Sequence, residues 1–207
     1  MDGVIVHSTP LHNRAWEIYL AEHGVPHDDI ETRMHGLRND DIVRDYFGDD
    51  LDDETVLRHG ADKERLYREL MQPELETWLV PGVRDFLAGH PAAPKAVASN
   101  AERANIDFVL DEAGLRQNFQ FIVDGHQAPR PKPFPDIYLA AASLLGVDPV
   151  NCIVFEDSLA GVQAAHEAGA RVVGLTTTLA SLPRVELAVP DFRDAALADW
   201  LSAQRRR

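Results

Sequence analysis

The sequence contains one cysteine, no apolar run long enough to span a membrane, and no repeats or low-complexity tracts. The single Cys152 excludes an internal disulfide, and its place in an apolar run indicates a packing residue in a reducing compartment. The first residues also lack the charged and then apolar pattern of a signal peptide. These absences exclude a disulfide-stapled fold and a membrane-spanning helix.

Basic residues are also scarce. The 207 residues include 20 Lys and Arg against 34 Asp and Glu, which gives a formal net charge of −14. Nucleic-acid binding requires a basic surface, so this charge argues against nucleic acid as the main partner. The hydrophobic fraction of 45% is enough for a sizeable core. We therefore expect a cytoplasmic monomer or weak dimer with neither a nucleic-acid nor a membrane partner.

An apolar run that ends in two acids is the most informative stretch. Residues 152–155 are typical of a buried strand, Glu156 and Asp157 follow at once, and Ser158 stands at the N-cap of a helix that ends at Gly169. In open α/β sheets such acids lie in the crevice at the carboxyl ends of the strands. Neighbouring carboxylates repel unless a proton or cation holds them, and oxygen ligands suit Mg²⁺. The alternative is a pair of acids that only favours the helix dipole.

Strand and helix patterns alternate in the second part of the chain. Patterns of this size indicate βαβ units and a parallel sheet. From residue 28 to 79 only helical patterns occur. We predict an α/β core of residues 1–11 and 80–207 with a helical insertion at 12–79. The predicted strands are 95–98, 119–123, 152–155, 171–175 and 188–189, and the predicted helices include 30–34, 40–47, 54–78, 83–88, 104–113 and 136–145.

Several predicted strands are followed by polar groups. Ser99 and Asn100 are common turn residues, and Lys132, in a proline-rich loop, could be a solvated surface charge. Asp2 could likewise be a turn acid. Together with the acid pair, however, they comprise the hydroxyl, ammonium and carboxylate groups that phosphoryl transfer requires.

These motifs resemble those of the haloacid dehalogenase superfamily, in the β-phosphoglucomutase-like branch of phosphatases and phosphomutases. The resemblance covers nearly the whole chain and implies a doubly wound parallel sheet, with the helical insertion as the family's mobile cap. The segments that carry it are Met1-Asp2-Gly3-Val4, Ala98-Ser99-Asn100, Lys132-Pro133-Phe134-Pro135-Asp136 and Phe155-Glu156-Asp157-Ser158-Leu159-Ala160-Gly161.

The resemblance implies a role for each of the polar strand-end residues. Ser99 and the N–H of Asn100 would hold the phosphoryl oxygens. Lys132 would bridge the phosphate and the nucleophile. Glu156 and Asp157 would ligate Mg²⁺.

The start of the chain departs from the family pattern. The family has Asp-x-Asp-Gly at the end of a central first strand, where the first Asp forms an aspartyl-phosphate and the second is the general acid/base. Asp2 matches the second, and its backbone carbonyl would contact Mg²⁺. Making Asp2 the nucleophile would place Val4 at the acid/base position, and a valine cannot transfer protons. We therefore expect that the numbering starts at an internal methionine, after a strand that ends in the nucleophilic Asp.

The helical insertion offers weaker signals. His12 falls where related sugar phosphomutases have a substrate-relay residue, but His12 and Trp16 also form an ordinary i, i+4 pair that could simply pack. Residues 36–39 resemble the cap's specificity loop, with Arg38 one place earlier than in those mutases. His12 and Arg38 are therefore predicted to bind substrate. The shifted arginine, together with His7 in place of a common Asp, weakens a mutase assignment.

The expected function is that of a Mg²⁺-dependent phosphatase acting on a small phosphorylated metabolite, with a sugar phosphate as the expected class. Two alternatives remain at this point. One is a phosphomutase, in which a second sugar hydroxyl replaces water as the acceptor. The other is a non-catalytic protein that keeps the fold as a binding or regulatory module.

Overall fold

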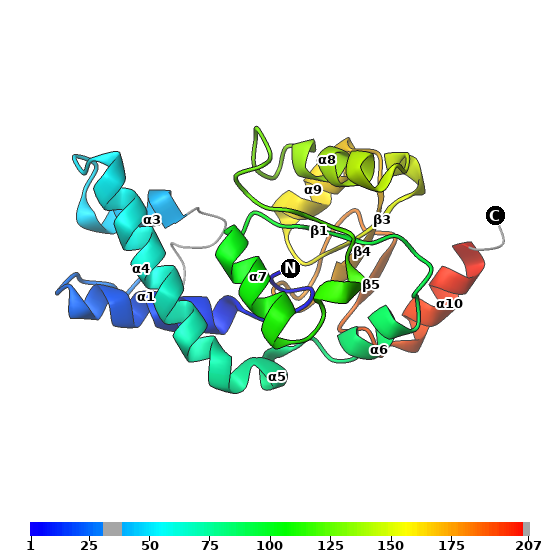
Figure 1. Cartoon of the computed structure of the whole chain (residues 1–207), viewed down its shortest axis with the longest axis horizontal. Coiled ribbons are helices and arrows are strands. Elements are labelled where there is room, and N and C mark those ends of the chain that lie inside the picture. The colour runs from blue at the N-terminus through cyan, green and yellow to red at the C-terminus, as the bar shows by residue number, and fades with distance from the viewer. Residues whose placement is uncertain (31–38, 205–207) are drawn as a thin grey trace. The chain divides into compact units, whose positions relative to one another are not determined.

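The structure, a computed structural model, describes residues 1–30 and 39–204 (Figure 1). It divides into two compact units, one made of Met1–His7 with Leu75–Arg207 and one made of Ser8–Glu74. The two boundaries between core and insertion that the sequence predicts lie a few residues later in the chain than the boundaries of these units. We call the first the α/β unit and the second the helical unit.

The helical unit contains α1 (Thr9–Glu22), α3 (Asn39–Phe47), α4 (Asp53–Met71) and the 3₁₀ turn η1 (Gln72–Glu74). Its core includes the buried side chains of Trp16 and Leu20, in keeping with the packing interpretation of Trp16. The helix predicted at 54–78 is divided, because Pro73 has no N–H to continue the α-helical hydrogen bonding. Most of the helix predicted at 30–34 lies outside the described residues.

The α/β unit alternates helices with parallel strands, as predicted. The elements of this unit are α5 (Leu75–Trp78), α6 (Val83–Ala88), β1 (Ala96–Ala98), α7 (Arg103–Glu112), η2 (Arg116–Asn118), β2 (Phe121–Val123), α8 (Asp136–Leu145), η3 (Pro149–Asn151), β3 (Ile153–Glu156), α9 (Leu159–Glu167), β4 (Arg171–Leu175), β5 (Leu187–Val189) and α10 (Ala195–Gln204). None of the helices in residues 1–30 and 39–204, in either unit, is long and apolar enough to cross a membrane.

The strands form two parallel sheets, β1-β2 and β3-β4-β5. Successive residues of β4 enter different cores, since adjacent side chains of a strand point to opposite faces. Val172 packs in a cluster with Ile137 of α8 and Val162 of α9, whereas Val173 packs in a cluster with Leu197 of α10. Helices therefore cover both faces, which is the doubly wound arrangement predicted from the sequence.

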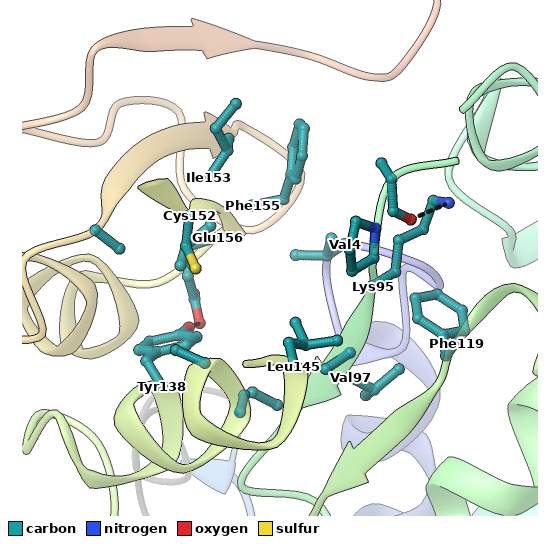
Figure 2. A pocket seen from close by; sticks show the side chains of 18 of the residues that line it. Val4, Lys95, Val97, Phe119, Tyr138, Leu145, Cys152, Ile153, Phe155 and Glu156 are labelled. Carbon is teal, nitrogen blue, oxygen red and sulfur yellow. Dashed lines mark hydrogen bonds between the residues drawn. The ribbon is translucent and has the colours of Figure 1, made fainter. Parts of the chain in front are cut away.

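A cavity of about 400 Å³ lies inside the α/β unit. Residues of β1 and residues of β3 both line it, as does the buried Met1, and Figure 2 shows side chains of both strands around it. Cys152, expected to be a packing residue of the strand, lies just before β3, is only partly buried and also lines this space.

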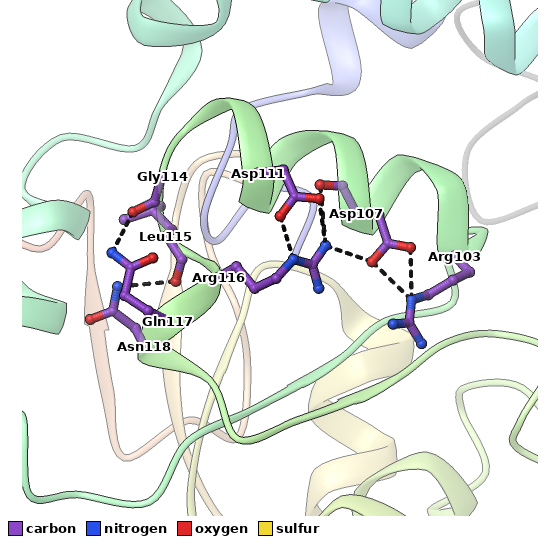
Figure 3. Close-up of polar contacts among 8 residues, drawn as sticks. All are labelled: Arg103, Asp107, Asp111, Gly114, Leu115, Arg116, Gln117 and Asn118. Atoms are coloured by element: carbon purple, nitrogen blue, oxygen red, sulfur yellow. Dashed lines mark hydrogen bonds and ion pairs between the residues drawn. The ribbon is translucent and has the colours of Figure 1, made fainter.

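A chain of ion pairs ties η2 to α7 (Figure 3). The Arg116 guanidinium donates to Asp107 at 2.6 Å and also to Asp111, while Nε of Arg103 donates to Asp107 at 2.9 Å. The hydrogen bond from Arg116 lowers the pKa of Asp111. Burial alone would raise the pKa of Asp107, but hydrogen bonds from both arginines outweigh it and the pKa is lowered. The network therefore anchors η2, which leads into β2, to α7.

Replacing Arg116 should lower the melting temperature more than replacing Arg103, because Arg116 serves two carboxylates and Arg103 serves one. We expect Arg116→Gln to cost at most a few degrees, since all these groups are partly exposed. The carboxylate pKa values lie below the ordinary value of 3.8, so the contribution is present above that pH and is lost only as pH falls through the lowered values. Thermal melts should therefore give the same difference at pH 7 and pH 5. A difference that persisted in about 1 M salt would contradict an electrostatic origin.

Candidate active site

The site begins where β3 ends. Glu156 is the last residue of β3, Asp157 follows, and Ser158 caps α9 by accepting a hydrogen bond from the N–H of Gly161 at 3.0 Å. The N-cap predicted from the sequence is thus confirmed. It turns the chain sharply after the strand and leaves both carboxylates at the carboxyl end of the three-stranded sheet.

Glu156 is buried and uses both carboxylate oxygens within the protein. Oε1 accepts from Nζ of Lys132 and from the hydroxyl of Tyr138, the latter at 2.5 Å. Oε2 accepts from the N–H groups of Asp157 and Ser158 at 3.0 and 3.2 Å and from Oγ of Ser158 at 3.0 Å. Burial alone would raise the pKa of Glu156, but Lys132 and Tyr138 outweigh it and lower the pKa to about 2. Glu156 is therefore a fixed negative charge at neutral pH.

The carboxylate of Asp157 is stabilised by fewer hydrogen bonds than that of Glu156. It accepts a hydrogen bond from Oγ1 of Thr178 at 2.5 Å. Burial and the neighbouring Glu156 raise its pKa to about 6, although Thr178 acts in the opposite direction. Its Oδ2 lies so close to Gly3 that a Cβ there would stand 1.9 Å away, and Gly3 has a φ of +64° that favours glycine. Asp157 thus has a carboxylate that favours a proton or a cation.

The first turn of the chain lies against this acid pair. Asp2 forms an isolated bridge with Val6, and the carbonyl of Gly3 accepts from Oγ1 of Thr177 at 2.5 Å. The negative charge of Asp2 contributes to the raised pKa of Asp157. Burial lowers the pKa of the Met1 amine, partly offset by Asp2. The structure therefore brings Asp2 and the acid pair together.

Lys132 connects the end of β1 with the end of β3. Its ammonium pairs with Glu156 and lies 3.5 Å from the carbonyl oxygen of Ala98. Its backbone N–H lies 3.5 Å from Oδ1 of Asn100. The side chain is only 10% exposed, so the surface-charge interpretation of Lys132 does not describe this structure. Ser99, the residue after β1, is also buried at this end of the sheet.

Sequence reasoning missed two contributors. Tyr138 was assigned only to a helix, although its position shortly after Lys132 on the buried face of α8 was a signal for a polar contact. Thr178 belongs to a run of threonines directly after β4, where a parallel strand delivers polar groups to the same edge. Both hydroxyls contact the acid pair.

The predicted substrate-binding residues His12 and Arg38 are not part of this cluster. His12 belongs to the helical unit, where its ring stacks on Tyr67 at 3.8 Å between centroids. Its Nδ1 lies 2.9 Å from Nζ of the buried Lys63, which also pairs with Glu64 at 2.9 Å. Arg38 lies outside the described residues.

The oxygen donors at this site fit Mg²⁺ in one particular mode. Within the described residues, no group of three or more His, Cys, Asp or Glu side chains is arranged to hold a metal ion. Magnesium, however, usually binds one or two carboxylates and takes its other ligands from water and substrate phosphate. Asp157 offers an undercompensated carboxylate for this mode, and Gly3, the residue after Asp2, lies against it. Glu156, the other predicted ligand, already uses both of its oxygens.

Comparison with known proteins gives consistent matches. The family model of the haloacid dehalogenase-like hydrolases matches residues 1–169. Fructose-1-phosphate phosphatase YqaB of Escherichia coli is 31% identical over 82% of this chain and 89% of its own length. A β-phosphoglucomutase of Mycobacterium bovis is 35% identical over 86% of this chain and 79% of its own length. The crystal structure of a HAD hydrolase, family IA, variant 3, from Entamoeba histolytica has a TM-score of 0.83 at 25% identity, covering 98% of this chain and 95% of that one.

Removing the charge of Lys132 should destabilise the α/β unit by about 3–5 kcal/mol, because Glu156 would remain as a buried, unpaired charge. We expect urea denaturation of Lys132→Met at pH 7 to show the whole of this decrease in the free energy of unfolding. The loss should shrink as pH falls from about 4.5 towards about 2, because the contribution of Glu156 is complete above its ordinary pKa of 4.5 and is lost as pH falls through its lowered pKa of about 2.

Two variants serve as controls for this measurement. Lys132→Arg keeps the charge and should retain most of the stability. Lys95→Met removes an ammonium that donates to backbone carbonyls, including that of Ala93 at 3.0 Å, and should cost no more than about 1 kcal/mol. Equal losses for Lys132→Met and Lys95→Met would contradict the buried ion pair.

Proposed function

The chain belongs to the haloacid dehalogenase-like hydrolases, and from the geometry of its site we propose that it is a Mg²⁺-dependent phosphatase acting on a small sugar phosphate. The family membership and these relatives make it an enzyme of the phosphatase or phosphomutase kind. The alternative of a non-catalytic binding module is thereby set aside.

The position of Lys132 is the observation that carries the proposal. Its ammonium lies between the carbonyl of Ala98, at the end of β1, and Glu156, at the end of β3. A cation fixed by packing at the carboxyl ends of parallel strands supports the binding of a phosphoryl group there. Such a cation neutralises the charge of that group without reorganising during the reaction.

We propose that Ser99 and Asn100 hold the phosphoryl oxygens from the β1 side. Ser99 is buried, and its Oγ accepts from the N–H of Ala101 at 3.2 Å, which orients the hydroxyl. The hydroxyl hydrogen then remains available for a phosphoryl oxygen. Lys132 would contribute its charge to the same oxygens while Glu156 keeps it in place.

Asp2 is proposed as the general acid and base. In the first step a carboxylate attacks phosphorus, the bond to the sugar oxygen breaks, and the leaving oxygen takes a proton from Asp2. In the second step water attacks the aspartyl-phosphate, gives a proton to Asp2, and releases phosphate with the regenerated carboxylate. In the family pattern the nucleophile is the residue two places before Asp2, which is the position directly ahead of Met1.

Asp157 is proposed as the main magnesium ligand, with the backbone carbonyl of Asp2. A bound Mg²⁺ would supply charge stabilisation for the phosphoryl oxygens. Glu156, also predicted as a ligand, would have to release Lys132 or Tyr138 to reach a metal. We therefore propose that its larger contribution is to orient Lys132 and the backbone of Asp157.

The substrate class rests on the relatives, which include a fructose-1-phosphate phosphatase and a β-phosphoglucomutase. We propose His12 and Arg38 of the helical unit as substrate-binding residues, as the family resemblance implies. The mutase alternative is kept because the 35% identity to a β-phosphoglucomutase exceeds the 31% identity to the phosphatase. Incubation with a hexose 1-phosphate separates the two, since a phosphatase releases inorganic phosphate and a mutase gives the hexose 6-phosphate.

The nucleophile assignment predicts a simple activity pattern. The chain that starts at Met1 should not hydrolyse sugar phosphates, because the nucleophile of the family pattern lies two places before Asp2. The same chain preceded by an apolar segment ending in Asp should release phosphate. With Asn in place of that Asp, phosphate release should fall by at least about a thousandfold while folding is retained, because an amide does not take up a phosphoryl group. Turnover by the chain from Met1 at ordinary enzymatic rates would show that the register is wrong.

Magnesium dependence should follow the ionisation of Asp157. Because its pKa is raised to about 6, a proton competes with the cation below that pH. In the chain preceded by the apolar segment that ends in Asp, we expect the Mg²⁺ concentration for half-maximal phosphate release to rise as pH falls from 7 to 5. Thr178→Val removes a hydrogen bond that lowers the pKa of Asp157, so it should move this rise to higher pH. A half-maximal Mg²⁺ concentration independent of pH, in both proteins, would contradict Asp157 as the ligand.

A further inference from the structure

Tyr138 lies on the buried face of α8, outside the segments that carry the family resemblance. It is only 8% exposed, and its hydroxyl donates to Oε1 of Glu156 at 2.5 Å. Figure 2 shows the two side chains directed towards each other. None of the proposed catalytic steps uses this hydroxyl. A tyrosine hydroxyl has one hydrogen to donate, and here it goes to the anion that also holds Lys132.

Tyr138 contacts both members of the buried ion pair, and it does so through different atoms. Its hydroxyl shares Oε1 of Glu156 with the ammonium of Lys132. Its ring lies against the other partner, with Nζ of Lys132 4.9 Å from the ring centroid, which is within the range of a cation–π contact. The side chains of Lys132 and Glu156 are almost fully enclosed, so water competes little with these contacts. One side chain therefore restrains the anion and the cation together.

The contact of the ammonium with β1 is a weak restraint by comparison. Nζ of Lys132 lies 3.5 Å from the carbonyl oxygen of Ala98, which is the long limit of a hydrogen bond. Because the lysine stem is flexible, the ammonium would move further towards Glu156 if Oε1 had room for it. The hydroxyl of Tyr138 occupies part of that oxygen, and the ring occupies the space beside the ammonium. Together they keep Lys132 between the ends of β1 and β3.

The hydroxyl also affects how strongly Lys132 attracts a second anion. Each hydrogen bond that a carboxylate accepts stabilises its charge. Within residues 1–30 and 39–204, Oε1 of Glu156 accepts from Lys132 and from Tyr138. Loss of the hydroxyl would leave that oxygen to the ammonium, and the ion pair would tighten. A tighter pair neutralises more of the charge of Lys132, so its attraction for a phosphoryl oxygen would fall.

We propose that Tyr138 is a positioning residue for phosphoryl binding: its hydroxyl and ring hold the ammonium of Lys132 where it can contact a phosphoryl dianion. Tyr138 would act only through Lys132 and Glu156, without touching the ligand. This role rests on the proposed function, because it requires a phosphoryl group at Lys132. It differs from that of a core residue, which would change stability and leave the phosphate affinity of the folded chain unchanged.

The test measures phosphate binding at Lys132 itself, in the full chain. The lysines of the chain are Lys63, Lys95 and Lys132, so peptide mass spectrometry can follow acetylation by acetic anhydride at each of them. We expect inorganic phosphate, added at constant ionic strength, to slow the acetylation of Lys132 and not that of Lys95. Tyr138→Phe keeps the ring and should raise the phosphate concentration for half-maximal protection at least about fivefold. Tyr138→Leu removes the ring as well and should raise it further.

Tyr46→Phe is the matched control. It removes another tyrosine hydroxyl that donates to a carboxylate, that of Asp29 at 2.8 Å in the helical unit, and should leave the protection of Lys132 unchanged. Urea denaturation of each variant verifies that it is folded under the conditions of acetylation. Tyr138→Phe leaves the buried ring in place, so we expect it to remain folded. A purely structural role would lower its free energy of unfolding and leave half-maximal protection at the same phosphate concentration.

Two outcomes would overturn the role of Tyr138, and they differ in what they say about the function. Equal protection of Lys132 in the unsubstituted chain and in folded Tyr138→Phe would show that Tyr138 does not position Lys132, and the proposed phosphatase function would stand. If phosphate did not protect Lys132 even in the unsubstituted chain, the phosphoryl site would be wrong. The proposed function would then fail together with the role of Tyr138.

Discussion

The buried ion pair between Lys132 and Glu156 is the contact on which the polar end of the α/β unit depends. The two sheets do not pair with each other in the described residues, yet Lys132 reaches Glu156 at the end of β3 and the carbonyl of Ala98 at the end of β1. Because both partners are almost fully enclosed, each would be an expensive isolated charge without the other. The pair therefore holds a cation at the point where we propose that a phosphoryl group binds.

The same pair gives the two neighbouring acids different pKa values. Glu156 receives five hydrogen bonds and stays charged, with a pKa of about 2. Its fixed charge, together with burial, raises the pKa of Asp157 to about 6. Two carboxylates next to each other in sequence thus acquire different properties from their surroundings. One becomes a structural anchor, and the other is left with affinity for a cation.

Sequence reasoning succeeded where a local pattern decides the structure. The bounds of α6, α8 and β4 match the predicted ones, and Ser158 caps α9, because apolar periodicity and capping act over a few residues. The break at Pro73 was missed, since the helical pattern continues on both sides of it. Tyr138 and Thr178 were missed for a different reason. Their local positions indicate polar contacts near the strand ends, but the carboxylates they contact lie 18 and 21 residues away and cannot be identified from a local pattern.

The first turn of the chain belongs to the same arrangement. Oδ2 of Asp157 lies so close to Gly3 that a Cβ at position 3 would stand 1.9 Å from it, and the carbonyl of Gly3 accepts a hydrogen bond from Oγ1 of Thr177. A side chain at position 3 would therefore displace either the carboxylate of Asp157 or the turn that carries Asp2. Because Thr178 donates to Asp157, the two neighbouring threonines hold both the turn and the carboxylate in place. The polar groups of the proposed site are thus pre-organised by contacts within the protein.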